Sequence, residues 1–241
     1  MSKTVYVLGI SVLLLTGLSG QAAAQGQPSA DPSAFINVGV GAQPQRRTLA
    51  ATSSVPLYDE IATIAATQQI RSGAFFEVSG GYRVAPRFAV AAGFSSFGRP
   101  GTGTLTASIP DPIFYDRPAT SSRDLGDLKH TERGIHVQAL YFLPVSPKID
   151  LALSAGPSFI RVSQQLPAMT VAADQSVTVG TTTESGTAKG FNAGLQTNYM
   201  FAPRYGVGFF VGYAGGSVDL PGAAGVKAGG VRTGVALQAR F

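Results

Sequence analysis

Two histidines are the residues that could carry out acid–base chemistry. They lie in the segment KHTERGIHVQ as His130 and His136. A catalytic histidine needs a serine or a carboxylate within hydrogen-bond reach, and such sets are recognised by geometry rather than by chain order. The segment itself holds no obvious nucleophile, but Asp150, Ser154 and Ser158 follow on a later strand pattern and face the same interior. The sequence therefore leaves open whether one of these residues lies within hydrogen-bond reach of a histidine. The favoured interpretation is that His136 is one interior polar residue among many, with no catalytic residue in the chain.

The sequence offers no convincing site for a metal, a phosphate or a nucleic acid. Two histidines and no cysteine cannot supply a compact zinc set. The GVG and GTG glycines lack the full spacing and the strand–turn–helix context of a nucleotide-binding loop. The formal net charge of +5 is mild, and the chain has no block of like charges. We therefore expect no metal, no cofactor and no nucleic-acid partner.

The N-terminal segment is typical of a secretory signal peptide. Lys3 precedes the apolar run VYVLGISVLLLTGL, and the alanines at 22–24 provide the small residues of a cleavage site. We predict a signal peptide over residues 1–24, a short lead over 25–33 and a single domain over 34–241. A retained anchor helix is the alternative, but the run is short for a bilayer span and small polar residues follow it.

Apolar residues alternate with small or polar ones in eight later segments. This period of two predicts β-strands, each close to the length of about ten residues that a tilted strand needs to cross a bilayer. The predicted strands cover residues 35–42, 74–84, 88–95, 135–143, 148–160, 190–201, 204–214 and 231–241. No stretch after the signal reaches about 18 consecutive apolar residues, which excludes membrane-spanning helices.

The connections between these strands alternate between short and long. YRVAPRF, YFLPVSPKI and YMFAPRY are tight turns, whereas the connections at about 43–73, 96–133, 161–189 and 214–229 are long and rich in Ser, Thr, Gly and Pro. The pattern predicts an all-β fold: an eight-stranded antiparallel up-and-down transmembrane β-barrel with short periplasmic turns and long extracellular loops. YDEIATIAATQQI and GTLTASIP are expected to extend strands beyond the membrane.

The interior face of the predicted barrel is polar. It is dominated by Gly, Ala, Ser, Asn and Gln, which are too small and polar for the core of a soluble sandwich or a lipocalin-like barrel, the alternative fold. Depth along the strands predicts a Glu77–Arg232 contact, with Asp150 offsetting Arg83 and Arg240 near the periplasmic end. Buried charges need such partners, so we predict a lumen polar plug made of Glu77, Arg83, His136, Asp150, Arg232 and Arg240.

Tyrosines are placed on the outward face near the predicted membrane boundaries. Tyr205 and Tyr213 are eight residues apart, which separates them by roughly 20 Å along the membrane normal for a strand tilted near 40°. This is about the separation of two aromatic girdles. The predicted girdle residues are Tyr82, Tyr141, Tyr199, Tyr205 and Tyr213.

The chain ends in GGVRTGVALQARF, an alternating strand that stops on Phe241. This strand resembles the last strand of bacterial outer-membrane barrels, in which a terminal Phe and alternating apolar residues are read by the periplasmic assembly machinery. The resemblance implies an assembly signal at Val235, Leu237, Ala239 and Phe241. In architecture the chain after the signal resembles the small barrels of the OmpX, OmpA transmembrane-domain and opacity-like type. We expect no periplasmic peptidoglycan-binding domain of the kind that full-length OmpA carries, so that anchoring role is not implied.

The resemblance implies a monomeric protein in the outer membrane of a Gram-negative bacterium. Its expected partners are outer-membrane lipids and lipopolysaccharide, the assembly machinery during biogenesis, and host or phage surface ligands reached by the loops. Three functions stay open. The first, which we expect, is a structural or surface-interaction role without catalysis. The second is a narrow porin-like conductance pathway. The third is a lipid-modifying enzyme, because some eight-stranded barrels hydrolyse or acylate lipid A with a histidine and a Ser or Asp partner.

Overall fold

The structure is a computed structural model that describes residues 33–172 and 177–241. The predicted signal peptide over 1–24 and all but the last residue of the lead over 25–33 lie outside the described residues. Ten strands are present: β1 (Ala34–Gln43), β2 (Arg47–Leu57), β3 (Glu60–Ile70), β4 (Gly73–Ala85), β5 (Phe88–Ile109), β6 (Ala119–Ser146), β7 (Ile149–Val171), β8 (Val177–Met200), β9 (Tyr205–Leu220) and β10 (Ala223–Arg240). Among the described residues, no helix is long and apolar enough to cross a membrane.

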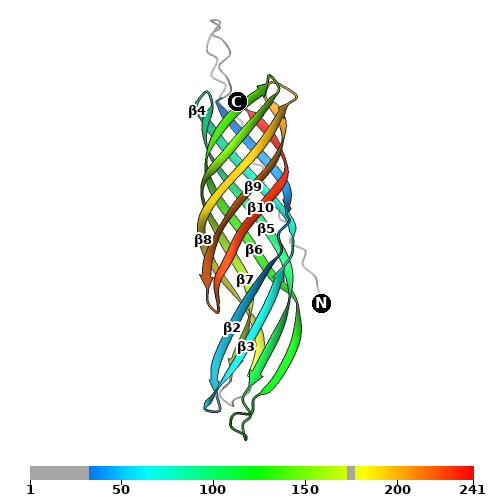
Figure 1. Ribbon diagram of the computed structural model, residues 1–241, viewed down its shortest axis with the longest axis vertical. Helices are drawn as coiled ribbons and strands as arrows, with labels where there is room; N and C mark the ends of the chain where they lie inside the picture. Colours follow the sequence, from blue (N-terminus) through cyan, green and yellow to red (C-terminus); the bar gives the residue numbers. More distant parts are fainter. Residues whose placement is uncertain (1–32, 173–176) are drawn as a thin grey trace, which may run out of the picture. The chain divides into compact units, whose positions relative to one another are not determined.

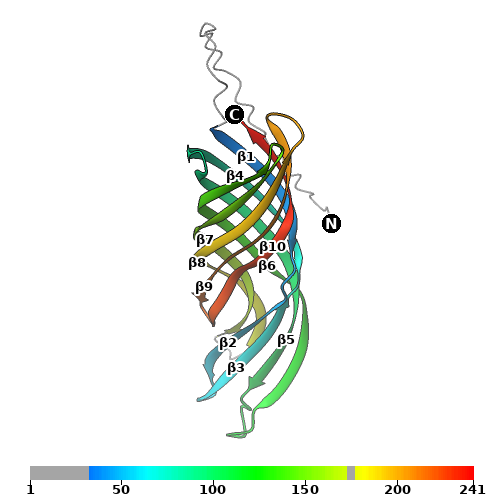
Figure 2. The same ribbon diagram turned by 45° about the horizontal axis from the view of Figure 1, so that its top comes forward.

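Eight of these strands close into a ring, which confirms the predicted barrel. The order around it is β5-β4-β1-β10-β9-β8-β7-β6, and β6 pairs again with β5. All pairings are antiparallel. β1 and β10 join the two ends of the domain, with Phe35 opposite Arg240 and Val40 opposite Val235. Figure 1 shows the blue β1 and the red β10 side by side, and Figure 2 shows β1 beside β4 on its other edge. Closure leaves no unpaired edge in the ring, the condition that lipid imposes on a sheet.

The outer connections differ from the prediction. The four segments expected as long loops, at about 43–73, 96–133, 161–189 and 214–229, are mostly strand. β5 and β6 stay paired from Phe88–Tyr141 to Ile109–Ala119, and β7 and β8 stay paired out to Val171–Val177. The loop prediction was wrong there because sequence rich in small and polar residues, with weak apolar contrast, still forms a regular ladder when a neighbouring strand supplies backbone partners. The expected extension of strands by YDEIATIAATQQI and GTLTASIP is confirmed in β3 and β5.

A β-hairpin lies outside the ring. β2 and β3 pair from Arg47–Ile70 to Leu57–Glu60 and are joined by Tyr58 and Asp59. Both residues have positive φ, 54° and 60°, as a two-residue type I′ turn requires. β3 pairs with the outer part of β5, and the backbone N–H of Thr52 in β2 donates to the Gly222 carbonyl at 2.9 Å. The hairpin therefore continues the barrel wall outward and is also attached to the β9–β10 turn (Figure 1).

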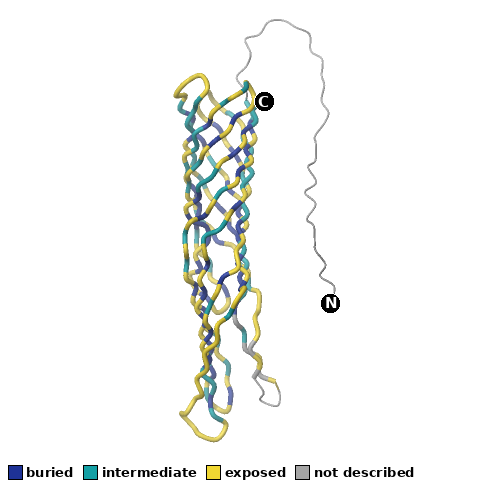
Figure 3. The backbone as a smooth tube through the Cα atoms, turned by 90° about the vertical axis from the view of Figure 1, so that its right-hand side faces the viewer, coloured by how far each residue is buried: buried dark blue, intermediate teal, exposed yellow. Residues whose placement is uncertain are grey.

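Burial alternates along the ring strands. Outward positions are exposed and apolar over a belt that includes Val38, Phe94, Ile135, Phe191, Val207 and Leu237, whereas inward positions are buried and mostly small or polar. Figure 3 shows buried and exposed residues alternating along each strand of the ring. An apolar outer face and a polar inner face are the reverse of a soluble protein, and they match a barrel that is solvated by lipid.

Candidate functional site

The candidate site is the lumen, where inward side chains of all eight ring strands meet. Its periplasmic end holds an ion pair between Arg240 Nη2 and Asp150 Oδ2 at 2.5 Å. Asn198 Nδ2 donates to the other carboxylate oxygen of Asp150 at 2.8 Å, and Arg240 Nε donates to Gln238 Oε1 at 2.9 Å. Arg83 lies at the same end, with its guanidinium carbon 4.6 Å from the centre of the Phe142 ring. The arrangement offsets the charge of Asp150 with Arg240, as depth along the strands predicts.

A second ion pair lies deeper in the barrel. Arg232 Nη1 on β10 contacts Glu77 Oε2 on β4 at 2.9 Å, which is the contact that alternation predicts. The two residues belong to strands on either side of β1, so the pair reaches across β1. Arg232 also lies 5.6 Å above the centre of the Phe75 ring. Phe75 fits there because Gly41 of β1 has no side chain: a Cβ at Gly41 would come within 2.7 Å of Phe75 and 2.2 Å of the Thr233 carbonyl.

His136 is fully enclosed beside this pair. Its Nδ1 lies 2.7 Å from Ser158 Oγ, its Nε2 lies 2.8 Å from Ser95 Oγ, and Arg232 Nη1 approaches Nε2 at 3.4 Å. Ser158 also accepts a hydrogen bond from Asn192 Nδ2 at 2.9 Å. The structure thus brings His136 and Ser158 together, a contact that the sequence left open.

This Ser–His pair lacks the other parts of a catalytic set. Asp150, the carboxylate that the sequence placed on the same strand face, is eight residues from Ser158, about 26 Å along the strand. It pairs with Arg240 instead. Ser154 bonds weakly to the Gly194 carbonyl at 3.5 Å. His136 and Ser158 have exposures of 1% and 0%, so a substrate has no access to the hydroxyl in this arrangement. The geometry is that of a hydrogen-bonded interior.

A third polar cluster, which sequence reasoning missed, lies above the belt. Glu132 Oε1 accepts from Arg47 Nη2 at 2.6 Å and from His130 Nε2 at 2.8 Å, and Glu132 Oε2 accepts from the Gly229 backbone N–H at 2.9 Å. Glu132 lies outside the apolar belt. Its neighbour Arg133 faces outward and is exposed, and the outward residues of the belt are apolar. Burial alone would raise the pKa of Glu132, but the hydrogen bond from His130 and the charge of Arg47 together lower it below its ordinary value.

The alternation along β6 could have revealed this cluster. His130, Glu132 and His136 share one face of the strand, separated by even steps, but the predicted strand began at Ile135. His130 extends the network through its Nδ1, which lies 2.6 Å from Gln164 Oε1. Gln164 in turn donates to Gln68 of β3 at 2.5 Å. The extra hairpin is thereby connected to the lumen network.

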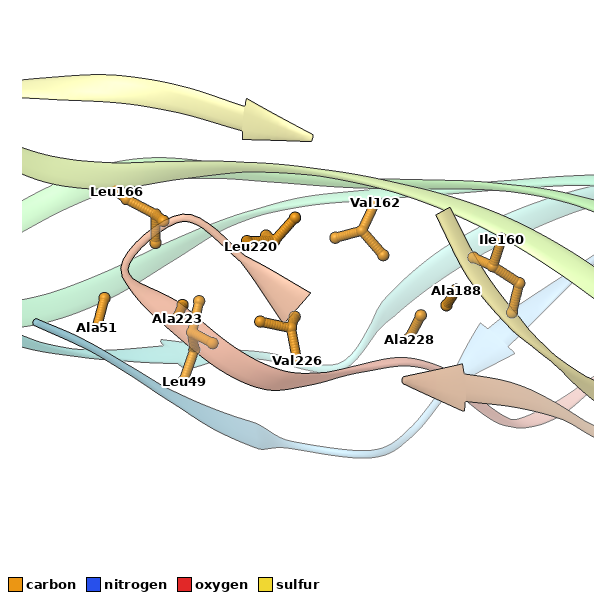
Figure 4. Close-up of a cluster of buried hydrophobic side chains, with 10 residues drawn as sticks. All are labelled: Leu49, Ala51, Ile160, Val162, Leu166, Ala188, Leu220, Ala223, Val226 and Ala228. Atoms are coloured by element: carbon orange, nitrogen blue, oxygen red, sulfur yellow. The ribbon is translucent and has the colours of Figure 1, made fainter. Parts of the chain in front are cut away.

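An apolar cluster fills the barrel interior outside these polar layers. It joins the inner face of β2 to β7, β8, β9 and β10 (Figure 4). Its buried members are Leu49, Ala51, Ile160, Val162, Leu166, Ala188, Leu220, Ala223, Val226 and Ala228. Burial of such side chains stabilises the outer strands by about 25 cal/mol per Å² of apolar surface removed from water. The hairpin strand β2 therefore covers the lumen from the outer side.

Little free volume remains in the polar part of the lumen. A cavity of about 50 Å³ lies against Asn37, Glu77, Gln138 and Arg232, and a smaller one of about 10 Å³ lies beside His136. The larger volume is enough for a few water molecules. Asn37 Oδ1 is buried there without a protein partner, so a bound water is the natural donor to it.

The remaining predicted residues lie on the outward face. Val235, Leu237 and Phe241 are exposed on β10 and just beyond its end, and Ala239 is half-buried between them. Tyr82, Tyr199, Tyr205 and Tyr213 are exposed, whereas Tyr141 is half-buried against Phe88. Their roles in assembly and in an aromatic girdle stay predictions. In the described part of the chain, no three His, Asp or Glu side chains gather as metal ligands.

Comparison with solved structures defines the class of fold. The outer membrane protein OprG of Pseudomonas aeruginosa aligns with a TM-score of 0.50 at 10% sequence identity, over 88% of this chain and 97% of that chain. The outer membrane protease OmpT of Escherichia coli aligns with a TM-score of 0.46 at 10% identity, over 86% and 97% of the two chains. Neisserial surface protein A aligns with a TM-score of 0.43 at 14% identity, over 86% and 97%.

The fold is that of the small outer-membrane β-barrels, as the C-terminal strand and the turn pattern indicate. No protein-family model matches the sequence, and no curated protein matches it. At 10% sequence identity to OprG the likeness shows the fold alone, so the function has to be argued from the lumen and the surface.

Proposed function

We propose that the protein is an integral outer-membrane barrel of a Gram-negative bacterium whose lumen is plugged and whose outer strands make contacts at the cell surface. The observation that carries the proposal is the filled interior. Two ion-paired layers, Arg240–Asp150 and Arg232–Glu77, lie below the Glu132 cluster, and the apolar cluster under β2 covers them. An eight-stranded barrel has an interior about wide enough for side chains, and these side chains occupy it. Catalysis is not part of the proposal, because the Ser158–His136 pair is enclosed.

Recording single-channel currents from refolded protein in a planar bilayer tests the plug. Wild type should give no resolved conductance. The variant Leu49→Ala/Leu220→Ala/Val226→Ala removes apolar side chains from the cluster under β2. Brief openings in this variant would show that the apolar cluster contributes to the plug, and a silent variant would show that the polar layers block ions by themselves. A large steady conductance in wild type contradicts the plug.

A narrow conductance pathway is the second candidate. It is favoured by the cavity beside Asn37, whose unpartnered Oδ1 and polar lining could hold a short chain of water. For the water chain to reach the outer end of the barrel, the side chains of the Glu132 cluster and those of the apolar cluster beyond it would have to move apart. The same recording decides, because a plugged barrel is silent and a water-filled one is not.

Contacts at the cell surface are supported by an apolar tip at the far end of the outer strands. The connection 110–118 between β5 and β6 exposes Ile113, Phe114 and Tyr115, with Ile113 80% and Tyr115 74% exposed. Asp111 Oδ1 accepts the backbone N–H groups of Ile113 and Phe114 at 2.8 and 3.0 Å. The tip lies about 50 Å along β5 from the belt residue Phe94 to Ile109, so lipid of the protein's own membrane does not cover it.

The charges around the tip favour a protein partner. The connection itself carries Asp111, Asp116 and Arg117. Glu60 of β3 lies beside it, because the Asp116 backbone N–H donates to Glu60 Oε1 at 2.9 Å, and Asp59 is adjacent to Glu60 in the chain. An acidic rim is repelled by anionic lipid and complements an apolar pocket with a basic rim. Cells that express the protein should attach to a surface coated with a basic, apolar polypeptide. Ile113→Ser/Phe114→Ser/Tyr115→Ser should abolish attachment, whereas the control Ser121→Ala should not. Equal attachment of cells that express wild type, the triple variant and the control contradicts this role.

A further inference from the structure

Three cations face outward immediately above the apolar belt on three consecutive strands. Arg133 of β6, Arg161 of β7 and Lys189 of β8 are all exposed. The next outward residues on the same strands, one pleat closer to the periplasmic turns, are the exposed apolar Ile135, Phe159 and Phe191. A step of two residues is about 7 Å along a strand. The charges are therefore at the depth where lipid headgroups meet the belt.

The strand register brings these cations together. Arg133 is directly opposite Arg161, and Lys189 is opposite Phe159, one diagonal step from Arg161. Side chains directly opposite one another have Cβ atoms about 5 Å apart, and like charges in such pairs destabilise a sheet. In the described part of the chain, no carboxylate lies within ion-pair distance of the three. The repulsion is therefore not offset by a protein anion.

Neutral donors surround the cluster. Arg161 Nη2 donates to Ser185 Oγ at 3.4 Å, and outward positions next to it in the register carry Ser163 and Thr187. The outward carboxylate on the neighbouring strand β9, Asp219, accepts the Gly225 backbone N–H at 2.7 Å. The surface thus combines two guanidinium groups, an ammonium and hydroxyls, which together suit an anion with several oxygen atoms.

We propose that Arg133, Arg161 and Lys189 form a binding site for the phosphate group of a lipid in the outer leaflet. Guanidinium groups bind phosphate through paired N–H donors, and a bound phosphate offsets the Arg133–Arg161 repulsion. The apolar belt directly below the site fits acyl chains that continue from the phosphate, which a free inorganic anion does not have. This inference rests on the proposed outer-membrane location and goes beyond it by assigning a lipid chemistry to one sector of the barrel.

Native mass spectrometry of the refolded protein in neutral detergent tests the site. The probes are phosphatidic acid, phosphatidylcholine and inorganic phosphate, added separately. Wild type should retain phosphatidic acid in preference to phosphatidylcholine, and Arg133→Gln/Arg161→Gln should weaken that retention by about tenfold or more, since two charge-assisted contacts are lost. The matched control Arg71→Gln/Arg123→Gln removes the same charge from exposed positions outside the cluster and should bind as wild type does.

Several results would overturn the proposal: equal retention of the two lipids by wild type, an equal loss in the control, or inorganic phosphate binding as tightly as phosphatidic acid. Folding is read separately from the gel mobility of unboiled samples. A wild type without heat-modifiable β-structure refutes the proposed barrel rather than the lipid site. If the double variant does not fold, wild type still decides, because raising the salt concentration should weaken phosphatidic acid binding strongly and phosphatidylcholine binding little.

Discussion

Replacing Glu77 by alanine leaves the Arg232 guanidinium inside the barrel without its carboxylate. The pair is 2.9 Å apart, and the side chain of Arg232 is 9% exposed. Breaking a buried pair typically costs about 3–5 kcal/mol. Glu77 is 24% exposed at its side chain, so water reaches part of it, and we expect a cost near the lower end, about 3 kcal/mol, for Glu77→Ala. Arg232→Ala should cost at least as much, because it also loses the contact with the Phe75 ring.

The double variant separates the contact from the residues. Once both charges are absent, neither is stranded, so Glu77→Ala/Arg232→Ala should be less destabilising than the sum of the single variants by about 2 kcal/mol. The chain has no tryptophan, so urea unfolding in lipid vesicles is best followed by the gel mobility of folded and unfolded protein.

A matched control uses a pair from different layers. Glu77→Ala/Arg240→Ala removes one partner from each ion pair without touching a shared contact, and its effects should add. Additivity of the Glu77 and Arg232 effects within about 0.5 kcal/mol means that the contact contributes nothing. Non-additivity of equal size in the control would show that the lumen responds as a whole rather than through this pair.

Three further predictions concern other parts of the barrel. Gly41→Ala should destabilise the protein by about 2–3 kcal/mol in the same unfolding assay, because the new Cβ would come within 2.2 Å of the Thr233 carbonyl; an unchanged midpoint would contradict the close approach. The pKa of Glu132 in the folded protein is lowered from its ordinary value of 4.5. The ionised carboxylate therefore stabilises the folded state at pH values above 4.5, and this contribution is lost as the pH falls through the pKa of the folded state. The stability advantage of wild type over Glu132→Gln should therefore shrink between pH 7 and pH 3, and a constant difference would refute the assignment. Phe241→Ala should lower the amount of protein in outer-membrane fractions and leave material in the periplasm, whereas Val231→Ala should not, and equal insertion would remove the assembly role.

The alternation of side chains determined the ring and much of its interior. A strand with lipid on one face and polar side chains on the other has a fixed period of two, so each residue is assigned to a face without knowledge of its neighbours. Closure then requires the first and last strands to pair, and this places Arg232 one strand away from Glu77 on the far side of β1. The ion pair follows from these two constraints, as does the position of Arg240 beside Asp150.

Tertiary structure alone decided the outer half. In RTLAATSSVPL the Ala, Ser and Thr residues of the two faces differ little in hydrophobicity, so the pattern does not distinguish a strand from a loop. Pairing of β3 with β5 and packing of β2 over the apolar cluster supply the energy that local sequence lacks. The same long-range pairing places Arg47 of β2 on Glu132 of β6. A contact between residues 85 positions apart depends on which strands become neighbours outside the membrane, and there no lipid restricts the choice.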